Sequence, residues 1–63
     1  MQEKDLIVVI DDDNEHYLQL GFIIDVINDY GNISYVIGFA DQTIVEVEAY
    51  DIITFCKRVI TDR

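Results

Sequence analysis

The chain has 63 residues, of which 13 are acidic and 4 are basic, so its formal charge is −9 at pH 7. A chain of this length makes one small domain, and a strongly negative surface repels phosphate backbones and anionic lipids, so we expect neither direct nucleic-acid binding nor membrane association. Because 51% of the residues are hydrophobic, such a small domain cannot bury them all, which leaves a homodimer open.

The first predicted strand covers residues 6–10, which are apolar and mostly β-branched. Residues 11–16 are too highly charged to be buried, so we expect a long polar loop with a partly ordered return to Gly21. The second strand covers residues 22–28 and places alternate side chains on opposite faces. The face with Asp25 is expected to be the more exposed one, so the sequence predicts Phe22, Ile24 and Val26 on the inner face and Ile23, Asp25 and Ile27 on the outer face.

A turn at residues 29–32, with Gly31 at positive φ, leads into a third strand over residues 33–39. That strand is expected to place Ile33, Tyr35, Ile37 and Phe39 on one face. A second tight turn at residues 40–42 leads to a fourth strand over residues 43–48. Its alternation predicts Val45 and Val47 pointing inward, with Glu46 and Glu48 pointing outward.

Residues 49–53 have the composition of a single helical turn, and residues 54–60 are expected to form a fifth strand. A helix over residues 49–60 is the alternative, because Ile52, Cys56 and Val59 fall at helical spacing. In either case the segment packs on the sheet. The sequence predicts an all-β class with five antiparallel strands.

Three motifs in this order are similar to the SH3-like small barrel in its Tudor and KOW-like forms. They are Gly21-x-x-Ile24-x-Val26, Tyr35-x-Ile37-x-Phe39-x-Asp41 and Val45-x-Val47-x-x-Tyr50-Asp51-Ile52. The resemblance covers nearly the whole chain and extends to short bacterial, phage or mobile-element proteins with this barrel. It implies a five-stranded barrel with one short helical turn before the last strand.

Several departures from that family bear on function. Ile24 occupies the place of the family's second glycine, and the chain contains no tryptophan, so it lacks the residue with which SH3 domains bind polyproline. KOW domains use basic loops to bind RNA, whereas the loops of this chain are acidic. The resemblance therefore implies the fold, and it implies neither polyproline nor RNA binding.

Cys56 is the only cysteine, so no intrachain disulfide forms and packing alone is expected to hold the fold. Residues 1–5 lack the basic head and apolar stretch of a signal peptide, and no apolar run approaches the roughly 20 residues of a membrane span. We expect a cytoplasmic protein with a single domain over residues 1–63 and an ordered core from about residue 6 to about residue 60.

Residues 11–15 place four carboxylates close together, which attracts hard cations such as Ca²⁺. The EF-hand pattern fails, since His16 stands where that loop needs glycine and Phe22 where it needs glutamate. No metal or cofactor is expected. A solvated acidic loop that docks on a Lys/Arg-rich partner fits the residues better.

Catalysis is not expected. His16 is the only histidine and, beside carboxylates, is typical of a surface residue. Cys56 is expected to be a buried structural cysteine. In the alternative, Lys57 and Arg58 would favour its thiolate, and a Cys–His pair would need folding to bring Cys56 and His16 together. A domain of this size also has little cleft for a substrate.

The sequence therefore predicts a non-enzymatic acidic interaction module that docks on a basic partner protein. The resemblance to Tudor domains adds an aromatic cage for methylated Lys or Arg at Tyr17, Tyr30 and Asp41. The alternative is a small-ligand or metal-binding accessory domain with a pocket at Tyr17, Phe22 and Ile23, and as a homodimer it would have its apolar surface covered by a second copy. The candidate partner-binding residues are Asp11, Asp12, Asp13, Glu15, Tyr17, Asp25, Tyr30, Asp41, Glu46 and Glu48.

Overall fold

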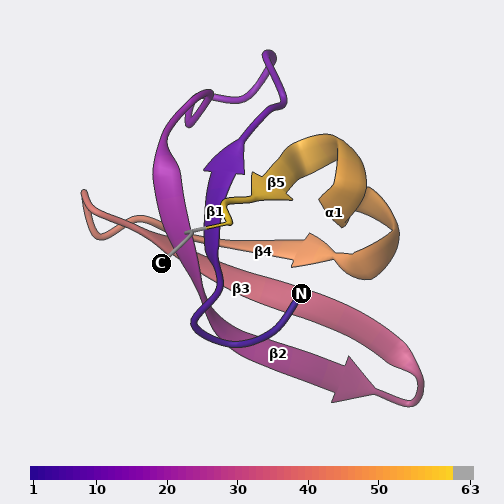
Figure 1. Ribbon diagram of the computed structural model, residues 1–63. Helices are drawn as coiled ribbons and strands as arrows, with labels where there is room; N and C mark the ends of the chain where they lie inside the picture. Colours follow the sequence, from indigo (N-terminus) through magenta and orange to yellow (C-terminus); the bar gives the residue numbers. More distant parts are fainter. Residues whose placement is uncertain (61–63) are drawn as a thin grey trace.

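Five antiparallel strands and one short helix make up the protein in a computed structural model that describes residues 1–60 (Figure 1). The strand order across the sheet is β4-β3-β2-β1-β5. A predominantly β fold with a short helical segment before the last strand is therefore confirmed. The elements are β1 (Leu6–Val9), β2 (Leu20–Asp29), β3 (Asn32–Phe39), β4 (Ile44–Glu48), α1 (Ala49–Phe55) and β5 (Cys56–Arg58).

The sheet is open in its hydrogen bonding. β4 and β5 stand at the two ends of the strand order and do not pair with each other within residues 1–60, so closure into a barrel is not confirmed. The short helix α1 joins these two end strands and contacts β3, β4 and β5 (Figure 1). It thereby covers the inner face of the curved sheet where strand pairing stops.

Both predicted hairpin turns are confirmed. Tyr30 and Gly31, with φ of 52° and 87°, occupy the two central positions of the β2–β3 turn, and positive φ at both positions defines a type I′ turn. In the β3–β4 turn the Gln42 N–H donates to the Phe39 carbonyl at 2.9 Å, and Gln42 itself has φ of 71°. The Asp41 carboxylate accepts the Thr43 N–H at 3.0 Å and closes this turn.

The two faces of β2 are the reverse of the prediction over its first half. Ile23 is completely buried, whereas Phe22 and Ile24 are 53% and 50% exposed. The cause is a β-bulge at Ile24, since Ile23 pairs with Ile37 and, after the irregularity, Val26 pairs with Tyr35. The extra residue brings Ile23 and Val26, three positions apart, to the same inner face.

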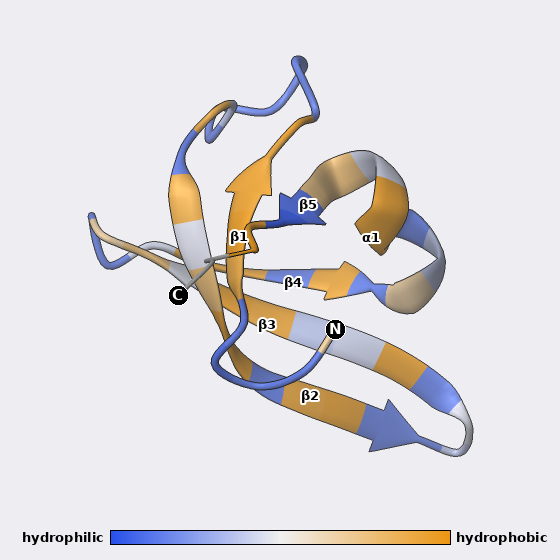
Figure 2. Cartoon of the chain, in the orientation of Figure 1, coloured by the Kyte–Doolittle hydropathy of each residue, from blue (hydrophilic) through white to orange (hydrophobic). Residues whose placement is uncertain are grey.

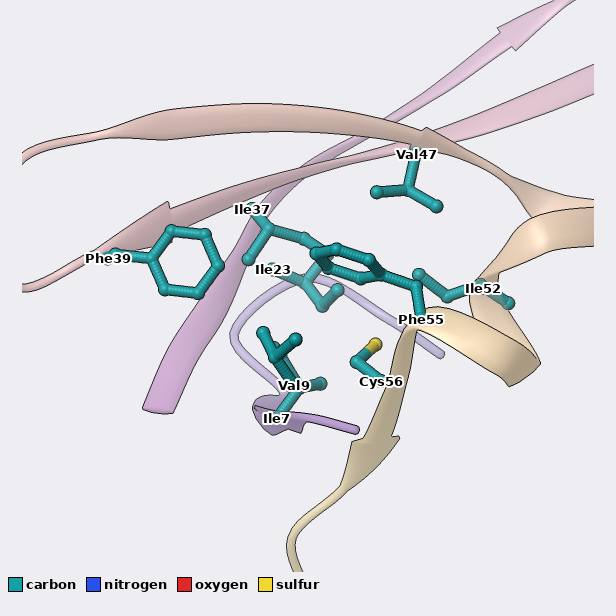
Figure 3. Packing of buried hydrophobic residues seen from close by; sticks show 9 residues of the cluster. All are labelled: Ile7, Val9, Ile23, Ile37, Phe39, Val47, Ile52, Phe55 and Cys56. Atoms are coloured by element: carbon teal, nitrogen blue, oxygen red, sulfur yellow. The ribbon is translucent and has the colours of Figure 1, made fainter. Parts of the chain in front are cut away.

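The core lies between the inner face of the sheet and α1 (Figure 3). Ile37 and Phe39 of β3 point inward as predicted, and so does Val47 of β4, with Val45 partly buried against the cluster. Burial of each large apolar side chain contributes roughly 1.5–3 kcal/mol, so this cluster is the main stabilising feature of the fold. Its members are Ile7, Val9, Ile23, Ile37, Phe39, Val47, Ile52, Phe55 and Cys56.

The last described segment combines the two predictions made for it. α1 continues to Phe55, two residues beyond the predicted turn, and β5 has only three residues, so a helix reaching residue 60 is wrong. The helix stops at Cys56 because that residue is extended and pairs with Val9 of β1. The predicted tail at residues 61–63 lies outside the described residues.

The described part of the chain has no helix that is long and apolar enough to cross a membrane. Apolar residues are concentrated in β1 and in parts of β2 and β3, while the turns and most of β5 are polar (Figure 2). Of the candidate site residues, Asp25, Glu46 and Glu48 lie on the sheet, and the others lie in the β1–β2 loop and the hairpin turns.

Candidate interaction surface

The acidic loop between β1 and β2 is folded on itself by short-range hydrogen bonds. Asp11 Oδ1 accepts the Asp13 N–H at 3.1 Å, and Asn14 Oδ1 accepts the His16 N–H at 2.8 Å. Carboxylate oxygens of Asp11, Asp12 and Asp13 lie within 4.8 Å of one another. Exposed acidic groups are common without a bound cation, and the property of this loop that bears on function is its concentrated negative charge.

His16 anchors this loop in the core, and its prediction as a surface residue is wrong. The side chain is almost completely buried, and its ring stacks on Phe39 with the centroids 4.1 Å apart and the planes 1° from parallel. Nδ1 lies 2.9 Å from Gln19 Oε1, while Nε2 has no hydrogen-bond partner among the described residues. The flat apolar face of Phe39 at the end of β3 explains the burial. In the sequence the one indication of this burial is Gln19, three residues after His16, because its amide can form a hydrogen bond with the imidazole.

A hollow of about 360 Å³ runs along the free edge of β4 and is bordered by carboxylates from three elements. Asp11 comes from the loop, Glu46 and Glu48 from β4, and Asp51 from the first turn of α1. The structure thus brings the predicted Asp11 close to the predicted Glu46 and Glu48, which lie more than 30 residues further along the chain. Asp51 was missed because the sequence placed it only in a helical turn, without indicating which way that turn faces.

Glu46 and Glu48 also border a second hollow, on the outer face of the sheet. It is lined by Asp29 at the end of β2 and by Ser34 of β3. Asp25 lies in the same cross-strand row as Glu46, because both pair with Val36. We call the acidic residues that border these two hollows, together with Asp25, the acidic surface: Asp11, Asp25, Asp29, Glu46, Glu48 and Asp51.

The basic side chains of residues 1–60 form no ion pair with this surface. Within residues 1–60 the only ion-pair contact closer than 4.0 Å joins His16 Nε2 and Glu15 Oε1, at 3.9 Å. Lys57 and Arg58 belong to β5, at the opposite end of the strand order from β4. One neutral group does bind the surface, since Tyr50 Oη donates to Glu48 Oε1 at 3.2 Å, and this hydrogen bond raises the pKa of Tyr50.

The residues proposed for an aromatic cage do not converge. Tyr30 is fully exposed at the tip of the β2–β3 hairpin, and Asp41 lies in the β3–β4 turn at the other end of β3. The eight residues of β3 separate them by about 23 Å. The Asp41 carboxylate is instead occupied by Thr43, whose side-chain and backbone hydrogen bonds lower the pKa of Asp41. Tyr17 is half-exposed in the β1–β2 loop.

Two other predicted arrangements also differ in the structure. Cys56 is 2% exposed, which confirms the expected buried cysteine, and burial raises the pKa of its thiol to about 11, so the alternative in which nearby cations favour its thiolate is wrong. Phe22 and Ile23 do border one hollow, but its other lining residues are Glu3, Lys4 and Ile24 rather than Tyr17.

The acidic surface is therefore the arrangement in this chain with the clearest chemical capacity, which is to attract and hold cationic groups. Its carboxylates are fixed on a sheet edge and a helix turn, and within residues 1–60 none is paired with Lys or Arg. A scan against protein-family models, a search of curated proteins and a search of solved structures each found no match to this chain.

Proposed function

We propose that this protein is a non-enzymatic interaction module that docks on a basic partner protein through the acidic surface. The observation that supports the proposal is the convergence of Asp11, Glu46 and Asp51 around the free edge of β4 without a Lys or Arg partner in residues 1–60. Fixed like charges repel each other, and this cost is offset when a cationic partner binds.

The positions of the carboxylates allow a cationic partner to approach them closely. Electrostatic attraction is screened beyond about 8 Å at physiological ionic strength, so a partner must place its Lys and Arg side chains close to the carboxylates. The hollows on both sides of Glu46 and Glu48 allow this approach from the sheet edge and from the outer face. The more distant loop carboxylates of Asp12, Asp13 and Glu15 would speed the encounter by long-range steering.

An SH3-like small barrel is part of the same proposal. The antiparallel order β4-β3-β2-β1-β5, the strongly bulged β2 and the helical turn before β5 support this relationship. In such a barrel β4 and β5 would approach each other, with α1 between them, and the acidic surface would occupy the side that belongs to β4.

The test uses a labelled Lys/Arg-rich peptide without apolar residues, and fluorescence anisotropy at about 50 mM and about 300 mM NaCl. The site variant combines Glu46→Gln, Glu48→Gln and Asp51→Asn. The matched control removes the same number of charges from the loop with Asp12→Asn, Asp13→Asn and Glu15→Gln. Circular dichroism verifies that each variant is folded.

The site variant is expected to lose about tenfold in affinity at low salt, while the control loses less than about threefold. Equal losses in the two variants would show attraction to net charge alone and would contradict docking at the acidic surface. Absence of binding at the lower salt concentration would overturn the proposal altogether.

A further inference from the structure

The outer face of the sheet has an apolar half that the core does not use. The strand registers align Leu6, Phe22, Gly38 and Ile44 in one row across β1, β2, β3 and β4. Phe22 and Ile44 in this row are 53% and 62% exposed. Two exposed apolar side chains that flank a glycine, with the partly buried Leu6 beside them, differ from the single scattered ones that need no explanation.

A hollow of about 400 Å³ lies within this apolar half. Gly38 forms part of its lining, and Leu20, Phe22 and Ile24 surround it. A side chain at position 38 would begin 3.5 Å from Ile24 Cγ2, so the glycine leaves room that any other residue would fill. We call the region formed by Leu6, Leu20, Phe22, Ile24, Gly38 and Ile44 the apolar face.

The apolar face and the acidic surface are continuous. Along β4 the outward residues are Ile44, Glu46 and Glu48 in succession, and along β3 they are Gly38, Val36 and Ser34. Successive outward residues of a strand are about 7 Å apart. The two glutamates therefore lie about 7 Å and about 14 Å along the strand from the apolar row.

Charge decides which occupant this combined surface fits. A second copy of the chain would bring another formal charge of −9 against it, whereas a basic partner would be attracted. On the side away from β4, Lys4 and Arg58 border a hollow that includes Leu6 and Phe22. Because Asp5 lines the same hollow, that side of the apolar face carries mixed charge, whereas the β4 side is acidic. This difference orients a bound cationic segment with its charges toward β4.

We propose that the outer face of β1 to β4 binds a segment of a partner protein in which bulky apolar side chains are followed by Lys or Arg. The apolar side chains occupy the hollow beside Gly38, and the cations contact Glu46 and Glu48. This inference rests on the proposed function and names the chemistry of the partner. The basic residues of the segment follow about two to four positions later if it is extended, or about five to nine if it is helical.

The test compares two labelled peptides of equal length and equal positive charge. One has an apolar block followed by a Lys/Arg block, and in the other each apolar residue is replaced by serine. The protein variants are Ile44→Thr and Phe22→Thr, and Ile53→Thr on α1 is the matched control, because Ile53 is 78% exposed and lies outside the apolar face. If Phe22→Thr does not fold, Ile44→Thr still tests whether the apolar face binds the peptide.

The peptide with the apolar block is expected to bind about tenfold more tightly than its serine counterpart. Ile44→Thr and Phe22→Thr should remove this advantage, while Ile53→Thr retains it. Equal affinity of the two peptides, or equal loss in Ile53→Thr, overturns the inference and leaves the proposed function standing. If neither peptide binds, the proposed function fails as well. A dimer in sedimentation that dissociates in Ile44→Thr would assign the face to a second copy and would also overturn it.

Discussion

The inner and outer faces of the sheet are both rich in apolar side chains, and they differ in what covers them. On the inner face Ile23 and Ile37 pair across β2 and β3 and are completely buried by α1 and the core. On the outer face Phe22 and Ile44 flank Gly38 and remain more than half exposed. Apolar character alone therefore does not make a residue part of the core, because within residues 1–60 α1 covers the inner face of the sheet and leaves these outer side chains exposed.

The largest expected difference between the faces follows from deleting an isoleucine on each. Ile37→Ala should lower the free energy of unfolding by about 2–5 kcal/mol, because it leaves a cavity among fully packed neighbours. Ile44→Ala, at an exposed position, should lower it by less than about 1 kcal/mol. Urea unfolding followed by circular dichroism measures both values. Similar losses in the two variants would mean that the outer face is also covered in solution.

The two strand glycines provide a second comparison of the faces. A Cβ at Gly21, on the inner face, would lie 3.0 Å from Ile37 Cγ2 and 3.0 Å from Phe39 Cε1, so Gly21→Ala should cost about 1–3 kcal/mol by overpacking. At Gly38 the nearest atom would be 3.5 Å away, an ordinary contact, so Gly38→Ala should stabilise the protein by about 0.4–1 kcal/mol, because alanine restricts the unfolded chain more than glycine does. Thermal unfolding distinguishes the pair. A destabilised Gly38→Ala would contradict an open hollow at that position.

The sequence predicted the strands, both hairpins and the inner face of β3, because these depend on local alternation and on turn residues such as Gly31. It failed for the first half of β2. In Phe22-Ile23-Ile24 every residue is apolar, so alternation has no signal there, and the bulge that selects Ile23 for the core depends on pairing with β3.

The candidate site was less predictable than the fold. The outward direction of Glu46 and Glu48 followed from the pattern of β4, but their approach to Asp11 and Asp51 depends on how the loop and α1 pack against that strand. The burial of His16 could not be predicted for the same reason, since the Phe39 ring on which it stacks is distant in sequence. Contacts between distant segments need the tertiary structure.

A smaller effect is expected in the β2–β3 turn, at a residue where stability and partner binding can be measured separately. Tyr30 is fully exposed and has φ of 52°, a conformation that asparagine adopts more readily than tyrosine. Tyr30→Asn should therefore stabilise the protein by about 0.5–1 kcal/mol, measured by urea unfolding. If Tyr30 also contacts the partner, the same variant would lose affinity for the peptide with the apolar block. Unchanged affinity would remove Tyr30 from the interaction surface.

The smallest expected effect is the pH dependence of the β3–β4 turn. Hydrogen bonds from Thr43 lower the pKa of Asp41 in the folded protein, so this carboxylate stabilises the fold above the usual aspartate pKa of about 4, and its contribution is lost as the pH falls through the lower folded value. Asp41→Asn should consequently be less stable than the parent protein near neutral pH and equal to it in strong acid.

The matched control for this measurement is Asp12→Asn, which removes the same charge from an exposed position of the β1–β2 loop. In a chain with a formal charge of −9, loss of any one carboxylate relieves some repulsion, so the control measures the general gain that the Asp41 variant also receives. The difference between the two variants, followed by thermal unfolding from neutral pH into acid, isolates the Thr43 hydrogen bonds. A difference that does not change with pH would show that the neutral amide binds Thr43 as well as the carboxylate does, and that charge at position 41 does not stabilise the turn.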